Sequence, residues 1–296
     1  MLKKVFTLIL VFSFSSFANG KSIESLKKDI NALLETKKAT DGVAILAGDS
    51  SESLSINGDR HLPMQSVFKY HIALAVLDQV DQGNLRLSDK IQITPNDLYN
   101  ELWSPIRENY PEGASLTLKE ILKFTVAKSD NVGCDLLIEI LGGPKAVEMY
   151  LHSKGITDIA IEYNEINMQA VWGRQYENWT TANASVLALK KYYENNEDLL
   201  SAQSHQFLWD TMKATSTGKK MIKGNLPKGT IVAHKTGSSG TNEAGLTAAR
   251  NNIGIIFLPD GRYFYLSVLV SNSTESKTEN KKIIADIAKL TWDYFK

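Results

Sequence analysis

The chain has a single cysteine, Cys134, so it can form no internal disulfide and offers no zinc site built from cysteine thiolates. Its five histidines are scattered, and none of them shows the HExxH spacing of a hydrolytic metal site. The sequence also lacks a GxGxxG motif and the lysine motif of phosphate-binding loops. We therefore expect a protein that works without a metal ion and without a cofactor.

The charged residues show no excess of either sign, because 33 lysines and arginines stand against 33 aspartates and glutamates. Proteins that bind nucleic acid usually carry a basic surplus, so we expect no nucleic-acid partner. The hydrophobic fraction of 43% and the charged fraction of 22% are those of a globular protein and exclude disorder of the whole chain. At about 150 residues per domain, the length predicts about two domains.

The first 18 residues have the pattern of a secretory signal peptide. Two lysines near the start precede an apolar run at residues 5–14, and residues 16–18 (Ser-Phe-Ala) form a small-x-small cleavage site. The apolar run is too short to hold the chain in a bilayer. We therefore predict that residues 1–18 are removed and that the rest is secreted across the inner membrane into the periplasm. We expect it to be a monomer with no stable membrane insertion.

Hydrophobic periodicity predicts strands near both ends of the chain and helices between them. The predicted helices span residues 23–34, 67–80, 118–126, 131–141, 145–152, 181–193, 203–212 and 281–295. The predicted strands span residues 42–47, 53–57, 230–236, 252–258 and 263–270. Residues 156–180 show no clear period, which is typical of a functional loop.

This order of elements predicts an α+β fold, in which the two groups of strands join in one antiparallel sheet flanked by the terminal helices. The helices between the strand groups would form an inserted, all-helical domain. We place the discontinuous sheet domain at residues 19–61 and 214–296, and the helical domain at residues 62–213. No long linker rich in proline, glycine or serine separates them, so the two domains are expected to be interleaved.

Ser66 and Lys69 stand three residues apart at the start of the most apolar predicted helix. This spacing places the hydroxyl and the amine on one helical face. In apolar surroundings the pKa of a lysine falls, so the lysine can act as a base and activate the serine as a nucleophile. The pattern is short, however, and taken alone it more often marks a serine that caps a helix and a solvated lysine.

Two further motifs are equally short when taken singly. Ser129-Asp130-Asn131 begins a predicted helix and could simply cap it. Lys235-Thr236-Gly237 ends a predicted strand, where the glycine would let a ligand approach the backbone closely, or where the strand simply passes into a loop. Found together in this order with the Ser66 motif, they form the signature of class A β-lactamases and penicillin-binding proteins.

Over essentially its whole mature length the chain resembles a class A serine β-lactamase. It looks closest to the branch that includes the PER, VEB and CfxA-type cephalosporinases. The resemblance is carried by residues 103–106 (Trp-Ser-Pro-Ile), 129–135 (Ser-Asp-Asn-Val-Gly-Cys-Asp) and 233–237 (Ala-His-Lys-Thr-Gly). It implies an enzyme that hydrolyses the β-lactam ring, takes small-molecule β-lactams as substrates with cephalosporins preferred, and confers resistance to these antibiotics.

The resemblance also implies catalytic roles at the three motifs. Ser66 is expected to be the acylated nucleophile, with Lys69 as its neighbouring base. Ser129 is expected to pass a proton to the β-lactam nitrogen as the ring opens. The oxyanion hole would be formed by the backbone N–H groups of Ser66 and Ser238.

Further residues are implied to bind the substrate. Asn131 would hold its amide side chain, and Lys235 and Thr236 would bind its carboxylate beside Gly237. Trp103 would form a wall of the cleft, although a tryptophan in a loop can also simply pack.

The irregular stretch decides between a β-lactamase and a penicillin-binding protein, because only a β-lactamase needs a base that activates water against the acyl-enzyme. The resemblance assigns this role to Glu165 and the holding of the water to Gln169. Glu162 and Glu177 are alternative candidates for the base, but the position of Glu165 relative to Gln169 fits better. Whether Lys69 or Glu165 takes the proton from the nucleophile is disputed for the family.

The chain departs from the family pattern in several places. Gln169 replaces an asparagine, and Tyr163 and Asn178 stand where the loop usually has an Arg–Asp ion pair, so we expect a loop that follows another path or is wider. No arginine follows soon after the Lys-Thr-Gly motif, the next being Arg250, which puts the family's second carboxylate clamp in doubt. The family's common disulfide cannot form, and we interpret Cys134 as a buried structural thiol.

Two other functions fit the same motifs. A small penicillin-binding protein acting on D-Ala-D-Ala peptides would acylate and stall, and it would not need Glu165. A non-catalytic sensor of β-lactams or peptidoglycan fragments would be expected to carry an anchor or a signalling partner. The signal peptide followed by an unanchored globular chain argues against the sensor.

Overall fold

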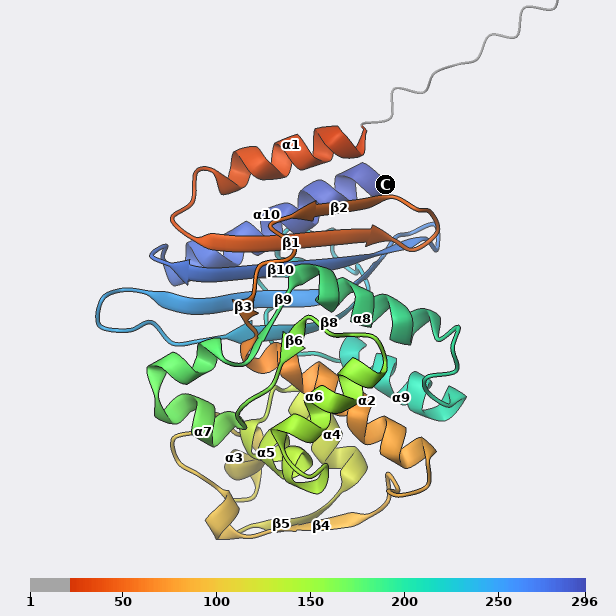
Figure 1. Cartoon of the computed structure of the whole chain (residues 1–296), viewed down its shortest axis with the longest axis vertical. Coiled ribbons are helices and arrows are strands. Elements are labelled where there is room, and N and C mark those ends of the chain that lie inside the picture. Colours follow the sequence, from red (N-terminus) through yellow and green to blue (C-terminus); the bar gives the residue numbers. More distant parts are fainter. Residues whose placement is uncertain (1–21) are drawn as a thin grey trace, which may run out of the picture.

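A five-stranded antiparallel sheet forms the centre of the structure, a computed structural model that describes residues 22–296 (Figure 1). The predicted signal peptide lies outside the described residues. The strand order is β2-β1-β10-β9-β8, so strands from both ends of the chain are neighbours, as predicted. The strands are β1 (Thr40–Ala47), β2 (Ser53–Ile56), β8 (Val232–Ser238), β9 (Thr247–Phe257) and β10 (Tyr263–Ser273).

Two helices from opposite ends of the chain, α1 (Ile23–Leu34) and α10 (Lys277–Phe295), cover one face of this sheet (Figure 1). Alternate side chains of β10, such as Phe264 and Leu266, join the apolar core beneath them. The intervening Tyr265 faces the other core, which the sheet shares with the helical part of the molecule. Because both faces of β10 are covered, the strand is apolar at successive positions instead of alternating.

Helices fill the other half of the molecule and pack around α2 (Phe68–Asp81), which is buried on nearly all sides (Figure 1). The remaining helices are α3 (Pro105–Asn109), α4 (Leu118–Ala127), α5 (Asn131–Ile140), α6 (Pro144–Ser153), α7 (Glu165–Ala170), α8 (Ala182–Glu194) and α9 (Ala202–Lys213). The predicted α+β fold is thus confirmed. The division of the chain at residues 61 and 213 stays a prediction.

The structure also contains several short elements that the sequence analysis did not predict. β4 (Lys90–Ile93) and β5 (Ala114–Thr117) pair in a separate two-stranded antiparallel sheet. β3 (Leu62–Pro63), β6 (Ile159–Ala160) and β7 (Trp179–Thr180) form a small separate sheet. The 3₁₀ helices are η1 (Gln65–Val67), η2 (Pro95–Asp97), η3 (Trp172–Tyr176) and η4 (Ile222–Gly224). Elements of two to five residues are too short to produce a recognisable hydrophobic period.

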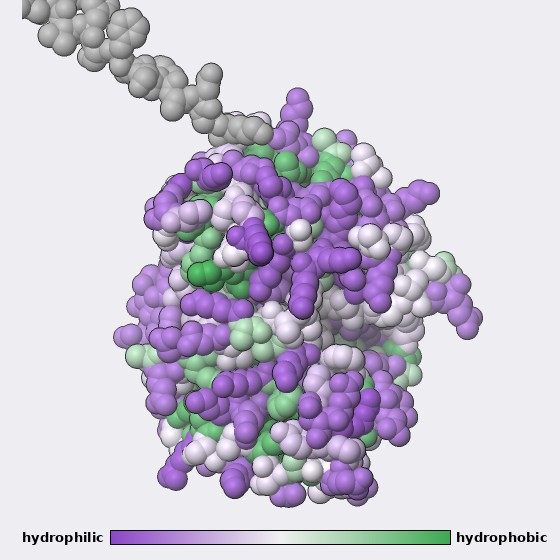
Figure 2. All heavy atoms as spheres, turned by 180° about the vertical axis from the view of Figure 1, so that it is seen from behind, coloured by the Kyte–Doolittle hydropathy of each residue, from purple (hydrophilic) through white to green (hydrophobic). Residues whose placement is uncertain are grey.

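The surface seen from behind is mainly hydrophilic, with apolar residues in small groups only (Figure 2). Within residues 22–296, no helix is long and apolar enough to cross a membrane. Cys134 is completely buried and unpaired, which agrees with its interpretation as a structural thiol.

Two buried histidines should make the fold sensitive to acid. Burial lowers the pKa of His71 from 6.5 to about 3, and burial with the charge of Lys223 does the same for His234. The stability that each neutral imidazole contributes is present above the unfolded-state pKa and is lost as the pH falls from 6.5 towards 3. Between these limits, each histidine should lower the free energy of unfolding by about 1.4 kcal/mol per pH unit.

Urea unfolding of the His71→Phe variant between pH 7 and pH 4.5 should therefore show a shallower loss of stability than the wild type. His61→Phe, at an exposed position, is the matched control and should keep the wild-type slope. Equal slopes for wild type and His71→Phe would contradict the neutral state of His71.

Candidate active site

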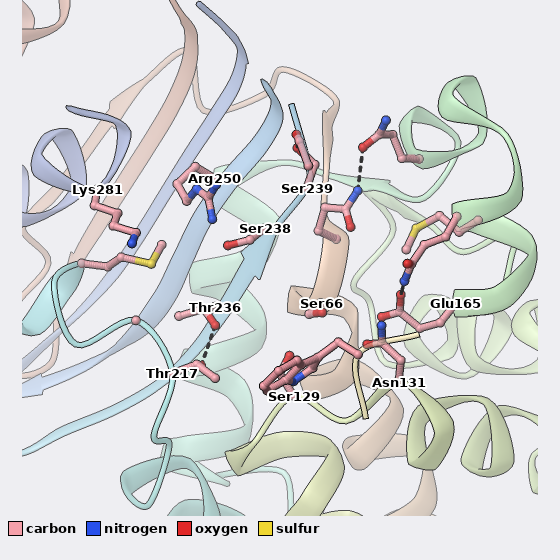
Figure 3. Close-up of a pocket in the computed structure, with 18 of the residues that line it drawn as sticks. Ser66, Ser129, Asn131, Glu165, Thr217, Thr236, Ser238, Ser239, Arg250 and Lys281 are labelled. Atoms are coloured by element: carbon pink, nitrogen blue, oxygen red, sulfur yellow. Dashed lines mark hydrogen bonds between the residues drawn. The ribbon is translucent and has the colours of Figure 1, made fainter. Parts of the chain in front are cut away.

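A pocket of about 610 Å³ lies between the edge strand β8 and the helical half of the molecule (Figure 3). Eight of the predicted site residues line it: Ser66, Trp103, Ser129, Asn131, Glu165, Gln169, Thr236 and Ser238. Lys69, Lys235 and Gly237 are buried beside them. Residues from distant parts of the chain therefore meet at one site.

The backbone holds Ser66 at the point where η1 runs into α2. Gln65, directly before it, has a φ of 48°, a left-handed conformation that is uncommon for residues other than glycine. Such strained positions persist where the surrounding structure enforces them, and they concentrate at functional sites. The result is a half-buried hydroxyl that faces the pocket at the start of a buried helix.

Lys69 connects three groups of the site. Its Nζ donates to Ser66 Oγ at 2.9 Å and to Asn131 Oδ1 at 2.8 Å, and it forms a fully buried ion pair with Glu165. Burial by itself would lower the pKa of Lys69, but the negative charge of Glu165 outweighs it together with weaker contributions, so the pKa is raised. The expectation of a lysine with a lowered pKa is wrong here, because a carboxylate lies where apolar surroundings were expected.

The second serine is paired with the second lysine in the same way. Lys235 Nζ donates to Ser129 Oγ at 2.9 Å and to the Thr236 carbonyl at 3.0 Å. Lys235 is completely buried, and burial together with the positive charge of Lys69 holds its pKa well below the usual value. Ser129 itself has a φ of 60°, so this side of the pocket also contains a left-handed residue.

Gly237 allows β8 to approach the turn that carries Ser66 closely. A Cβ at this position would lie 2.3 Å from the carbonyl oxygen of Met64, the residue directly before η1. Any larger residue would therefore push the strand away from Ser66. The close approach brings Ser238 to the edge of the pocket on the side where Ser66 lies (Figure 3).

Glu165 begins α7 and is almost completely buried, with 1% of its surface exposed. One of its oxygens pairs with Lys69, and Gln169 donates to the other from Nε2 at 2.8 Å. The spacing of four residues on a short helix brings Gln169 back over the carboxylate. Glu162 instead pairs with Lys145 at the surface, and Glu177 accepts a hydrogen bond from Tyr163. Of the three glutamates considered from the sequence, only Glu165 lines the pocket.

The loop that carries Glu165 is anchored by Asp135, a residue to which the sequence analysis assigned no role. Its carboxylate accepts the backbone N–H groups of Glu165 at 2.6 Å and of Ile166 at 3.0 Å. Burial and the nearby charge of Glu165 raise the pKa of Asp135 to about 7. Its spacing of four residues from Asn131 on α5 was an available signal, since it places both on one helical face.

Asn178 closes the base of the same loop in place of the missing ion pair. Its Oδ1 accepts the N–H groups of Glu162 and Tyr163 at 2.8 and 2.9 Å, and its Nδ2 donates to the Tyr163 carbonyl at 2.8 Å. One completely buried amide thus satisfies three backbone groups. The loop is closed by hydrogen bonds of a neutral residue instead of by opposite charges.

Arg250 also lies at the site, although it is 15 positions after Lys235 in the sequence. The turn between β8 and β9 reverses the chain, and Arg250 is the register partner of Ser238. Its side chain lines the pocket next to Ser238 (Figure 3). The antiparallel pairing of the two strands therefore brings a second cation to the end of the Lys-Thr-Gly motif.

Two exposed tryptophans stand at the pocket. Trp103 is 55% exposed and donates from Nε1 to the Lys128 carbonyl at 3.3 Å. Trp172, from η3, is 38% exposed and also lines the pocket, and the sequence analysis did not single it out. Aromatic rings that remain exposed beside a cavity offer flat apolar surface to a ligand.

The fold and the two serine–lysine pairs beside a buried carboxylate define the protein as a hydrolase. Comparison with known proteins gives the family. Residues 25–295 match the model of the beta-lactamase enzyme family, and the chain belongs to this family as a class A β-lactamase, which hydrolyses β-lactams.

Individual relatives agree with this assignment. Beta-lactamase VEB-1 of Pseudomonas aeruginosa is 45% identical over 295 residues, which cover 100% of this chain and 98% of the relative. Extended-spectrum beta-lactamase PER-1 of the same organism is 43% identical, covering 97% and 92%. The crystal structure of TLA-1 extended-spectrum β-lactamase superimposes with a TM-score of 0.90 at 47% identity, covering 93% of this chain and 99% of the other. The resemblance to class A enzymes of the PER and VEB type is thus confirmed.

Proposed function

We propose that this β-lactamase hydrolyses cephalosporins preferentially, through an acyl-enzyme on Ser66 that is released by a water molecule activated by Glu165. The observation that supports this most directly is the buried Glu165 carboxylate, which reaches Lys69 on one side and Gln169 on the other. The names of the relatives TLA-1 and PER-1 as extended-spectrum enzymes support the cephalosporin preference.

In acylation, Ser66 Oγ attacks the lactam carbonyl, and the oxyanion that forms is held by the N–H groups of Ser66 and Ser238. Because its pKa is raised, Lys69 is protonated at rest and cannot take the serine proton without first passing its own proton to Glu165. If Glu165 instead takes the Ser66 proton through a water molecule, Glu165 again becomes protonated. Both routes therefore end with the proton on Glu165. The C–N bond of the lactam then breaks, and Ser129, assisted by Lys235, gives its proton to the leaving nitrogen. The proton held on Glu165 returns through Lys69 to Ser129, so that Glu165 is ionised again before deacylation.

In deacylation, Glu165 takes a proton from a water held with Gln169, and the hydroxide equivalent attacks the ester carbon. The C–O bond to Ser66 breaks, and Ser66 recovers its proton. Lys235, Thr236 and Arg250 bind the substrate carboxylate, since all three lie on β8 and β9 at one end of the site. Asn131 and Trp103 contact the substrate's amide side chain. Export of the enzyme to the periplasm as a monomer would place it where β-lactams meet their targets, and it would confer resistance there.

Intact-mass spectrometry over time, with absorbance recording ring opening, tests this proposal. With a cephalosporin in excess, we expect a transient adduct on Ser66 and many turnovers per enzyme molecule. A penicillin-binding protein with the same motifs would show a persistent adduct and no turnover. That outcome, or the absence of any adduct, would contradict the proposed mechanism.

A further inference from the structure

We propose that Lys281 and Lys220, next to Arg250, form a second anion-binding subsite that takes an acidic substituent at C3 of a cephalosporin. The inference rests on the proposed function, because it specifies which cephalosporins the same pocket selects. It concerns the end of the pocket that is remote from Glu165 and lies beyond the place expected for the ring carboxylate.

Arg250 supplies the first observation. Only 6% of its surface is exposed, and within residues 22–296 no group accepts a hydrogen bond from its Nε. A buried guanidinium with an unsatisfied donor costs free energy unless an anion binds to it. Figure 3 shows its side chain between Ser238 and Lys281, on the pocket side of the sheet.

Lys281 and Lys220 supply the second observation. Both line the pocket, and Lys281 is partly buried near the start of α10. The pKa of Lys281 is lowered by burial and by the positive charges of Arg250, Lys277 and Lys220. Within the described part of the chain, neither Lys281 nor Lys220 forms an ion pair with a carboxylate. Like charges held together without a counterion favour the binding of an anion.

The residues that line the pocket carry more positive than negative charge. Among the residues that line it, Glu165 is the one carboxylate, and its charge is already taken by Lys69. The single carboxylate of a β-lactam would be bound by Lys235, Thr236 and Arg250. Lys281 and Lys220 would then still face the pocket without a partner.

The chemistry of cephalosporins indicates which second anion fits. The substituent at C3 is attached to the ring carbon next to the one that bears the carboxylate, so an acidic group there lies within a few bonds of Arg250. An acidic group on the acylamido side chain would lie instead towards Asn131 and Glu165, where the negative charge of Glu165 repels it. The subsite should therefore respond to charge at C3.

Three cephalosporins with one acylamido side chain and an acidic, a neutral or a cationic group at C3 (ceftriaxone, cefotaxime and cefepime) test this inference. We expect kcat/KM for the acidic compound, relative to the neutral one, to fall about threefold to fivefold in Lys281→Gln, as for a partly exposed ion pair. Lys281→Arg, which keeps the charge, should retain the wild-type ratio. Lys282→Gln is the matched control, because Lys282 is exposed and pairs with Asp286.

Binding to the Ser66→Ala variant separates this inference from the proposed function. Calorimetry should show tighter binding of the acidic compound than of the neutral one, and the difference should shrink when Lys281→Gln is added. Preferential binding without hydrolysis by the wild type would overturn the proposed function and leave the subsite standing. Equal binding of the acidic and neutral compounds, or the same change in Lys282→Gln as in Lys281→Gln, would overturn the subsite.

Discussion

Glu165→Ala should convert the enzyme into one that acylates and then stalls. Removing a general base that acts in the transition state reduces a rate about a hundredfold to ten-thousandfold, so deacylation should become slow enough for the adduct on Ser66 to accumulate. Lys69 would lose its buried partner, and burial would then lower the pKa of Lys69, so that it becomes a better base for acylation. The adduct should therefore still form, and intact-mass spectrometry after mixing with a cephalosporin should show it persisting.

Glu162→Ala and Glu177→Ala are the matched controls for this experiment. Both remove a glutamate from the same segment, but Glu162 pairs with Lys145 and Glu177 with Tyr163, away from Ser66. Both variants should turn over at close to the wild-type rate. Rapid turnover by Glu165→Ala, or stalling in either control, would contradict the role proposed for Glu165.

Ser66→Ala should have the largest effect of any single substitution. Without its hydroxyl no acyl-enzyme forms, and kcat should fall about a millionfold, as when the nucleophile of a serine hydrolase is removed. Lys69 would lose one acceptor but keep Asn131 and Glu165, so the buried charges stay satisfied and the fold should be retained. The measurement is the initial rate of ring opening, together with intact mass and thermal unfolding.

Ser239→Ala provides the comparison for loss of a hydroxyl at the same pocket. Ser239 Oγ, directly after β8, donates to the Gly240 carbonyl at 2.7 Å and accepts the backbone N–H of Ala249 on β9 at 2.9 Å. This variant should still form the covalent adduct. A covalent adduct on Ser66→Ala, at any residue, would show that the nucleophile has been assigned wrongly.

Much of the architecture could be predicted because it depends on local patterns. The buried helix α2 follows from an almost unbroken apolar run, and α1 was predicted at Ile23–Leu34, where the structure has it. The hairpin of β9 and β10 follows from two apolar runs separated by a turn. The strands near both ends of the chain were expected to join in one antiparallel sheet. A sheet made of either group alone would leave strand edges and an apolar face exposed.

The chemistry of the site depended more on what surrounds each residue. The spacing of Ser66 and Lys69 on one helical face was readable from the sequence, and the two side chains do meet. The direction in which the pKa of Lys69 shifts could not be read from the sequence. It is decided by the charge of Glu165, which is 96 residues away along the chain. Burial lowers the pKa of a lysine, whereas a carboxylate in contact with it raises that pKa. Only the fold sets which of the two effects is larger.

The sequence by itself determined the family, the order of the main elements and the placement of Ser66 and Lys69 on one helical face, since these depend on residue type, period and short spacing. The tertiary structure decided that Arg250 returns beside Ser238, that Asp135 and Asn178 hold the loop of Glu165, and that Lys281 reaches the pocket. Each of these contacts joins residues from separate elements. Hydrogen bonds and the strongest electrostatic interactions act over a few ångströms in space. The number of residues between two side chains in the sequence does not tell how far apart they lie in the fold.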